Sequence, residues 1–156
     1  MGNSLIGSYT ARFDKSGRIK IPAKFRAAIE EEYGKELFIT SLDDEAVQVY
    51  PLSIWKKLTN ITGEGLLHLK PDVRMFMLRV NLKGSQYEID SKGRILISQA
   101  LREKAVLDGE IEVVGLNNHK EIWNRQKLEE KLNKHPLTGE NFEQIANLSF
   151  LKGRTE

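Results

Sequence analysis

Hydrophobic and polar residues alternate in several short runs of this chain, and these runs occur in the same order twice. The segments 36–40 (ELFIT) and 47–51 (VQVYP) have the alternation and composition that are typical of strands. The segments 110–116 (EIEVVGL) and 121–124 (EIWN) repeat this pair in the second half. The pattern predicts an α+β fold in which each half contains strand, turn, strand, helix, strand, strand and helix, in that order.

Helical spacing appears between these strands. The segment 22–33 is the first predicted helix, because Phe25 and Ile29 lie four residues apart on one face. Pro22 suits the first helical turn, and Gly34 suits the end of the helix. The second half has an equivalent predicted helix from Ser98, a residue of the N-cap type, to Asp108 and Gly109. Further helices are predicted at 52–58, 70–84 and 125–132 and beyond Pro136, and a loop is predicted at 62–65.

A sequence repeat underlies this duplicated order. The stretch DKSGRIKIPAKFR (14–26) shares six of its thirteen residues, at equivalent places, with DSKGRILISQALR (90–102). A repeat at a fixed offset indicates two copies of one structural unit. In each copy the Asp-x-x-Gly segment is typical of a hairpin turn, in which the aspartate accepts backbone N–H bonds and the glycine supplies a positive φ. Turn structure alone therefore accounts for four residues, which are Asp14, Gly17, Asp90 and Gly93.

The arginine directly after each turn glycine, Arg18 or Arg94, is not required by turn geometry. One explanation is an ion pair with the aspartate four residues earlier, although exposed pairs contribute only about 0–1 kcal/mol. The other explanation is a guanidinium that grips a phosphate or a guanine edge. The sequence leaves both explanations open.

Local charge favours a polyanionic partner for the first copy. The whole chain has a net charge of only +2. Positions 12–26 nevertheless hold six basic residues against one acidic residue, whereas positions 88–102 hold three against two. A basic cluster of this density on a short turn and helix start indicates a polyanionic partner rather than an ordinary solvated face.

Several other classes of function lack support. The 156 residues contain no cysteine, so disulfides and thiolate zinc sites are excluded. The three histidines have no ligand spacing, and there is no Walker loop or G-x-S-x-G motif, so we expect no cofactor, metal, small-molecule substrate or enzyme activity. The acidic stretch 43–45 is more typical of a polar loop than of a weak cation site. Trp55 and Trp123 are better explained by core packing than by base stacking.

The first residues and the length of the apolar runs bear on where the protein acts in the cell. No charged leader precedes a long apolar run, and no run approaches the roughly 20 residues that span a bilayer, so we expect a cytoplasmic protein without membrane attachment. The start MGNSLI superficially matches a myristoylation signal. A tail in which Leu5 and Ile6 are buried, or face another subunit, is the simpler interpretation.

The paired Asp-x-x-x-Arg motifs, with VYPLSIW after the first and EIWN after the second, resemble the MraZ family of the AbrB-like superfamily. The resemblance implies two tandem AbrB-like units, each a β-hairpin and helix, interlocked as a swapped-hairpin β-barrel with a pseudo-twofold axis and flanking helices. It implies SpoVT-AbrB-like domains at 8–54 and 84–127, a connecting helical segment at 55–83 and a helical tail at 128–156.

The resemblance also implies function. Proteins of this family are expected to bind double-stranded promoter DNA of the division and cell-wall gene cluster, at the nucleoid, as a homo-oligomeric ring. The residues then expected to contact DNA are Arg18, Arg94, Lys15, Lys20, Lys24, Arg26, Lys92 and Arg102. Lys24 has no charged counterpart in the second copy and Lys20 aligns with Leu96, so the two copies should contribute unequally. The alternative is an antitoxin-like module that chiefly binds a partner protein, against which the duplication and the short tail argue.

Overall fold

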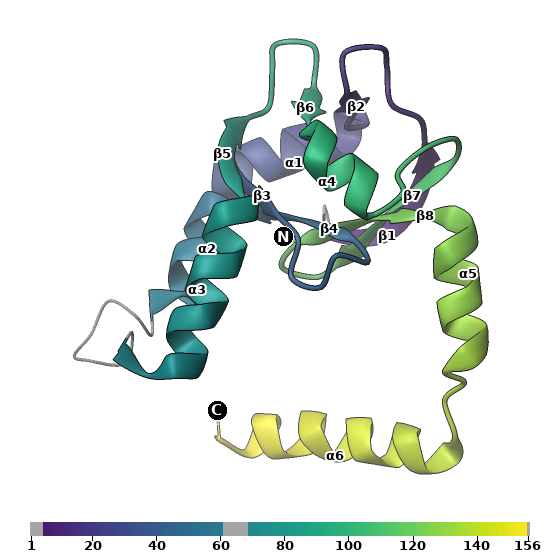
Figure 1. Ribbon diagram of the computed structural model, residues 1–156. Helices are drawn as coiled ribbons and strands as arrows, with labels where there is room; N and C mark the ends of the chain where they lie inside the picture. The colour runs from purple at the N-terminus through teal and green to yellow at the C-terminus, as the bar shows by residue number, and fades with distance from the viewer. Residues whose placement is uncertain (1–4, 61–68, 156) are drawn as a thin grey trace. The chain divides into compact units, whose positions relative to one another are not determined.

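The computed structural model describes residues 5–60 and 69–155 (Figure 1). The predicted loop at 62–65 and His68 therefore lie outside the described residues. The first copy contains β1 (Ile6–Ala11), β2 (Arg18–Lys20), α1 (Ala23–Tyr33), β3 (Glu36–Thr40), β4 (Val47–Pro51) and α2 (Leu52–Leu58). After α3 (Pro71–Lys83), the second copy contains β5 (Ser85–Glu88), β6 (Arg94–Leu96), α4 (Gln99–Lys104), β7 (Ile111–Leu116), β8 (Lys120–Asn124) and α5 (Arg125–Lys134). The last helix is α6 (Gly139–Thr155).

The predicted α+β class and the predicted order of strands and helices in each copy are confirmed. One helix boundary was wrong. The second-copy helix was expected to reach residues 108–109, but α4 ends at Lys104. Val106 takes a positive φ of 55°, which a helix cannot accommodate, and the Leu107 N–H returns to the Arg102 carbonyl at 2.8 Å. The chain turns early because this conformation places Leu107 in the core.

Strand pairing joins the two copies, although β3 with β4 and β7 with β8 also pair within a copy. The large sheet has the order β1-β7-β8-β4-β3-β5, and β2 pairs with β6 in a second, two-stranded sheet. Both tight turns are present, but β1 does not pair with β2 in a local hairpin. Instead β1 lies antiparallel to β7, and β5 lies antiparallel to β3.

The main core draws on both copies equally. Ile19 and Ile95 face each other in the β2–β6 register, and both are buried. Leu5 is also buried, whereas Ile6 is exposed. Burying an isoleucine side chain contributes about 1.5–3 kcal/mol, so neither copy would retain this core without the other.

A second hydrophobic cluster packs α2 and α3 against the sheet. Its rings are Phe38, Tyr50 and Trp55, and the Phe38 and Trp55 ring centroids are 4.7 Å apart. Trp123 on β8 is also buried. The prediction that both tryptophans belong to packed regions is therefore confirmed.

The chain divides into a compact unit that ends at Arg125 and a C-terminal unit that begins at Gln126. Within the C-terminal unit, α6 carries the predicted apolar positions Phe142, Ile145 and Leu148, and all three side chains are exposed. None of the helices in the described parts of the chain is long and apolar enough to cross a bilayer.

Candidate nucleic-acid interface

The two Asp-x-x-Gly turns lie next to each other at one end of the compact unit (Figure 1). The pairing of β2 with β6 causes this. Arg18 lies opposite Leu96 and Lys20 lies opposite Arg94, so the strand that leaves each turn runs antiparallel to its counterpart. Residues that are 76 positions apart in the repeat thus share one surface.

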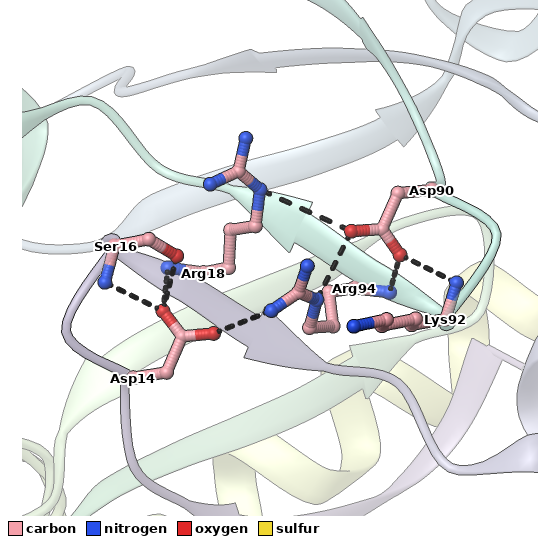
Figure 2. Close-up of polar contacts among 6 residues, drawn as sticks. All are labelled: Asp14, Ser16, Arg18, Asp90, Lys92 and Arg94. Atoms are coloured by element: carbon pink, nitrogen blue, oxygen red, sulfur yellow. Dashed lines mark hydrogen bonds and ion pairs between the residues drawn. The ribbon is translucent and has the colours of Figure 1, made fainter.

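Asp14 organises the first turn. One of its carboxylate oxygens accepts hydrogen bonds from the Ser16 hydroxyl at 2.6 Å, the Ser16 N–H at 2.9 Å and the Arg18 N–H at 3.0 Å (Figure 2). Gly17 completes the turn with a φ of 80°. The Ser16 hydroxyl, followed by the Arg18 N–H, lowers the pKa of Asp14 from 3.8 to about 2. The carboxylate is therefore charged throughout the physiological pH range.

Asp90 organises the second turn in the same way. Its Oδ1 accepts from the Arg94 N–H at 2.8 Å and from the Lys92 N–H at 2.9 Å. The hydrogen bond from the Arg94 N–H, and to a lesser extent that from the Lys92 N–H, lowers the pKa of Asp90. Gly93 has a φ of 77°. Both turns thus hold the following arginine through its backbone N–H.

The two arginine side chains differ sharply in their partners. Arg94 donates from Nε to Asp90 Oδ2 at 3.0 Å and from Nη1 to Asp14 Oδ2 at 3.1 Å. The closest carboxylate to Arg18 is that of Asp90, with its Oδ2 3.9 Å from the Arg18 Nε. In Figure 2 the contact with Asp90 starts from the Arg18 Nε, and the two terminal nitrogens lie on the side of the guanidinium that faces away from Asp90.

The two explanations that the sequence left open therefore apply to different copies. An ion pair with the aspartate four residues earlier forms in the second copy, where Arg94 meets Asp90. In the first copy the Arg18 side chain pairs with no carboxylate of its own turn, and among the described residues it reaches only the distant Asp90 oxygen. The Arg18 guanidinium is thus the more available of the two for an external anion.

The other basic residues that were predicted to contact DNA fall into two groups. The exposed group consists of Lys15, Lys20, Lys24 and Lys92. Arg26 and Arg102 are only partly exposed and are engaged inside the protein. Arg26 Nε lies 3.2 Å from Glu30 Oε1, and Arg102 Nε donates to the Ile97 carbonyl at 3.0 Å.

The sequence did not indicate the contacts between copies. Arg94 with Asp14, and Arg18 with Asp90, join residues of different repeats, and the available local signal was the four-residue spacing. The offset of 76 residues places equivalent turns together but does not say which carboxylate meets which guanidinium. Only the register of β2 against β6 decides that.

The acidic stretch 43–45 forms a loop, as the sequence indicated. Asp44 there pairs with Lys83 of α3 at 2.9 Å. Within the described residues, no three His, Asp or Glu side chains lie close enough together to hold a metal ion. His119 stacks on the Tyr50 ring with 4.3 Å between centroids, and its Nε2 lies 3.6 Å from Glu121 Oε2. His119 thus has a packing role.

Comparison with known proteins gives a consistent result. A family model described as "MraZ protein, putative antitoxin-like" matches residues 5–65 and 82–148. A protein of Acidobacterium capsulatum named "Transcriptional regulator MraZ" is 34% identical over 140 residues, which cover 90% of this chain and 95% of that protein. Proteins of the same name from Thermoanaerobacter sp. and Finegoldia magna are 38% and 36% identical over 143 residues each, which cover 91% of this chain and 94% of those proteins.

Proposed function

The chain belongs to the MraZ family, and we propose that it is a regulator of transcription that binds a specific promoter sequence in double-stranded DNA. The names of its relatives support the general role. By family resemblance, the proposed target is the division and cell-wall gene cluster, including the protein's own promoter. A protein with this role would act in the cytoplasm, at the nucleoid.

The observation that carries the proposal is the position of Arg18. Its guanidinium follows a rigid turn and its terminal nitrogens face away from Asp90, the one carboxylate that it contacts among the described residues, at 3.9 Å. A guanidinium held this way can donate two parallel hydrogen bonds to a phosphate or to a guanine edge without first breaking a strong internal pair. The exposed Lys15 and Lys20 would add phosphate contacts around it.

We also propose that the exchanged strand pairing represents a swapped-hairpin barrel made by one chain. The pairs β1–β7, β2–β6 and β3–β5 each join one copy to the other and support this proposal. The arrangement serves DNA binding because it holds two turns on one rigid base. A rigid base limits the entropy that is lost when the turns bind DNA.

Oligomer formation is part of the proposal. One chain presents few well-placed cations, and these give too few phosphate contacts for tight binding. Several chains in a ring would act together through effective concentration. Light scattering at micromolar protein should therefore show a closed oligomer. A monomer that binds DNA with full affinity would refute this part.

The direct test is binding to the DNA upstream of the protein's own gene. A fluorescent duplex of that region is titrated with protein in the presence of a scrambled duplex of the same length and composition. The proposal predicts that the unlabelled native duplex competes far better than the scrambled one. Equal competition would remove sequence specificity, and no binding by either duplex would remove DNA as a partner.

Salt dependence supplies a second test. Each neutralised phosphate contributes roughly −0.9 to the slope of log affinity against log salt concentration. The intact protein should give a clearly negative slope of several units. A slope near zero would exclude the polyanion contact on which the proposal rests.

The second candidate is a protein-interaction module of the antitoxin kind, which the words "antitoxin-like" in the description of the matching family favour. The duplicated unit argues against it, because a module for one partner needs no second turn. A stoichiometric partner protein that co-purifies with the chain and competes with DNA would favour this alternative.

A further inference from the structure

Arg26 and Arg102 occupy equivalent places in the two copies. Each is the fourth residue of the helix that follows the basic turn, in α1 and in α4 respectively. The sequence suggested that both contact DNA, as cations on an exposed helix start. In the structure, the side chain of each arginine lies against the turn of the opposite copy.

Arg102 lies against the first turn on two sides. A methyl group placed on Gly17 would lie 2.8 Å from Arg102 Nη2 and 3.0 Å from its Cζ. The same guanidinium lies over the Phe13 ring, 5.8 Å from its centroid. The Arg102 Nε donates to the Ile97 carbonyl at 3.0 Å, and the Ile97 N–H donates to the Gly17 carbonyl at 3.1 Å. The guanidinium is thus fixed at its base while its plane covers the turn.

Arg26 makes the corresponding contact with the second turn. A methyl group on Gly93 would lie 3.1 Å from Arg26 Cδ and 3.4 Å from its Nη1. The Gly93 carbonyl accepts from the Ile21 N–H at 2.8 Å. Position 89, which is equivalent to Phe13, holds isoleucine and offers no ring for a guanidinium. Arg26 therefore lacks the ring contact that Arg102 makes beside the first turn.

We propose that Arg102 and Arg26 are positioning residues, each of which holds the DNA-contacting turn of the other copy in its binding geometry. This inference rests on the proposed function for its purpose but not for its geometry. Gly17 and Gly93 are buried although they belong to surface turns, and the arginine side chains cover them. Arg102 then controls the orientation of Arg18, and Arg26 controls that of Arg94.

The first experiment needs no DNA. Amide spectra of ¹⁵N-labelled protein are compared for the wild type, Arg102→Lys and Arg26→Lys. Lysine keeps the charge but has neither the Nε donor nor the planar face. We expect Arg102→Lys to shift the amide signals of Ser16 and Gly17 and to leave that of Gly93 in place. Arg26→Lys, the matched control, should do the reverse. Unmoved turn signals, or equal shifts in both turns, would overturn the proposal.

The second experiment measures affinity for the upstream duplex in a double-mutant cycle. Arg102→Lys should weaken binding by about tenfold, as expected for coupled neighbours, and should leave the salt slope unchanged. This loss should disappear in an Arg18→Ala background and persist in an Arg94→Ala background. The loss caused by Arg26→Lys should show the opposite dependence. Thermal unfolding of each variant confirms that the folded fraction is the same.

A direct DNA contact predicts different results. Arg102→Lys would then bind almost as well as the wild type, since lysine still neutralises a phosphate. Arg102→Ala would reduce the magnitude of the salt slope by about one, and its effect would add to that of Arg18→Ala. Either result would overturn the positioning role. If the wild type binds no DNA, the proposed function fails, while the amide spectra still decide whether the two arginines hold the turns.

Discussion

The Arg94 Nη1 lies 3.1 Å from the Asp14 Oδ2, although the two residues are 80 positions apart and belong to different copies of the repeat. The reciprocal contact, from Arg18 to Asp90, is 3.9 Å long. The pseudosymmetric turns therefore use their arginines differently. The Arg94 side chain is held by two carboxylates and joins the copies, whereas the Arg18 side chain has one long carboxylate contact among the described residues.

This asymmetry predicts that Arg94→Ala has the larger effect on stability and Arg18→Ala the larger effect on DNA affinity. Arg94→Ala should lower the unfolding free energy by up to about 1 kcal/mol, because exposed pairs contribute little, and Arg18→Ala should lower it less. Affinity for DNA should fall more for Arg18→Ala than for Arg94→Ala. Denaturant titration and duplex binding measure the two quantities on the same samples.

The form of the Arg18 effect distinguishes base recognition from phosphate contact. Loss of a base contact should cost about 1–3 kcal/mol for the cognate duplex alone, whereas loss of a phosphate contact should weaken cognate and random DNA alike. If Arg18→Ala instead unfolds the protein while its folded fraction binds DNA normally, Arg18 serves only the turn.

Substitution of the turn glycine should act through stability. Gly17→Val forces a β-branched residue into a φ of 80° and sets its Cβ against the Arg102 guanidinium. Gly7→Val is the matched control, because Gly7 has a φ of 88° but a Cβ there meets no atom within 4 Å. Backbone strain costs about 1–3 kcal/mol in both variants. Because only Gly17→Val also displaces the Arg102 guanidinium, it should lower the melting temperature more than Gly7→Val. Equal melting temperatures would show that the contact with Arg102 is unimportant.

Acid should destabilise the protein through the turn aspartates. The pKa of Asp14 falls from 3.8 to about 2 on folding, so the unfolded chain binds the proton more readily. This contribution to stability is complete above about pH 4 and is lost as the pH falls towards about 2. The lowered pKa of Asp90 acts in the same direction. Stability measured by denaturant at a series of pH values should fall across this window.

Asp14→Asn tests the origin of that acid dependence. The amide oxygen can still accept from the Ser16 and Arg18 N–H groups, but it no longer titrates. The variant should therefore show a shallower loss of stability between about pH 4 and pH 2. An acid branch that superimposes on that of the wild type would mean that other carboxyl groups control it.

Lys120 on β8 is a buried cation that the protein tolerates at a cost. Its side chain is 4% exposed, and its Nζ has no hydrogen-bond partner among the described residues. The rings of Phe25 and Tyr9 lie 4.7 and 5.5 Å from that nitrogen. An unsatisfied buried donor costs about 1–3 kcal/mol, so Lys120→Met should raise the unfolding free energy by a similar amount. Lys57→Met is the control, because Lys57 is exposed on α2, and this substitution should change the unfolding free energy little.

The same lysine predicts an alkaline effect. Burial lowers the pKa of Lys120 below 10.5, so the unfolded chain holds the proton more tightly. The contribution of Lys120 to stability should therefore rise as the pH increases from its folded-state pKa towards 10.5. Lys120→Met should lack this part of the rise. A variant with the wild-type alkaline profile, or one that is less stable than the wild type at neutral pH, would contradict this account of the buried amine.

Local features of the sequence determined the order of elements and the position of the candidate site. Alternation and helical spacing depend on near neighbours, so β3, β4, β7 and β8 could be located from the chain alone. The repeat indicated two copies of one unit, and the Asp-x-x-Gly pattern indicated the turns because aspartate and glycine each satisfy a local backbone requirement. The basic cluster near Arg18 was likewise visible as a run of charges.

Tertiary structure decided which residues meet. The register of β2 against β6 gives Arg94 two carboxylates and leaves Arg18 with one distant contact, and a shift of one residue would turn these side chains to the other face. Packing across the copies also turned Arg26 and Arg102 from apparent surface cations into covers for the glycine turns, and it buried Lys120. These outcomes depend on strands that lie far apart in the chain, so spacing within one copy carries no information about them.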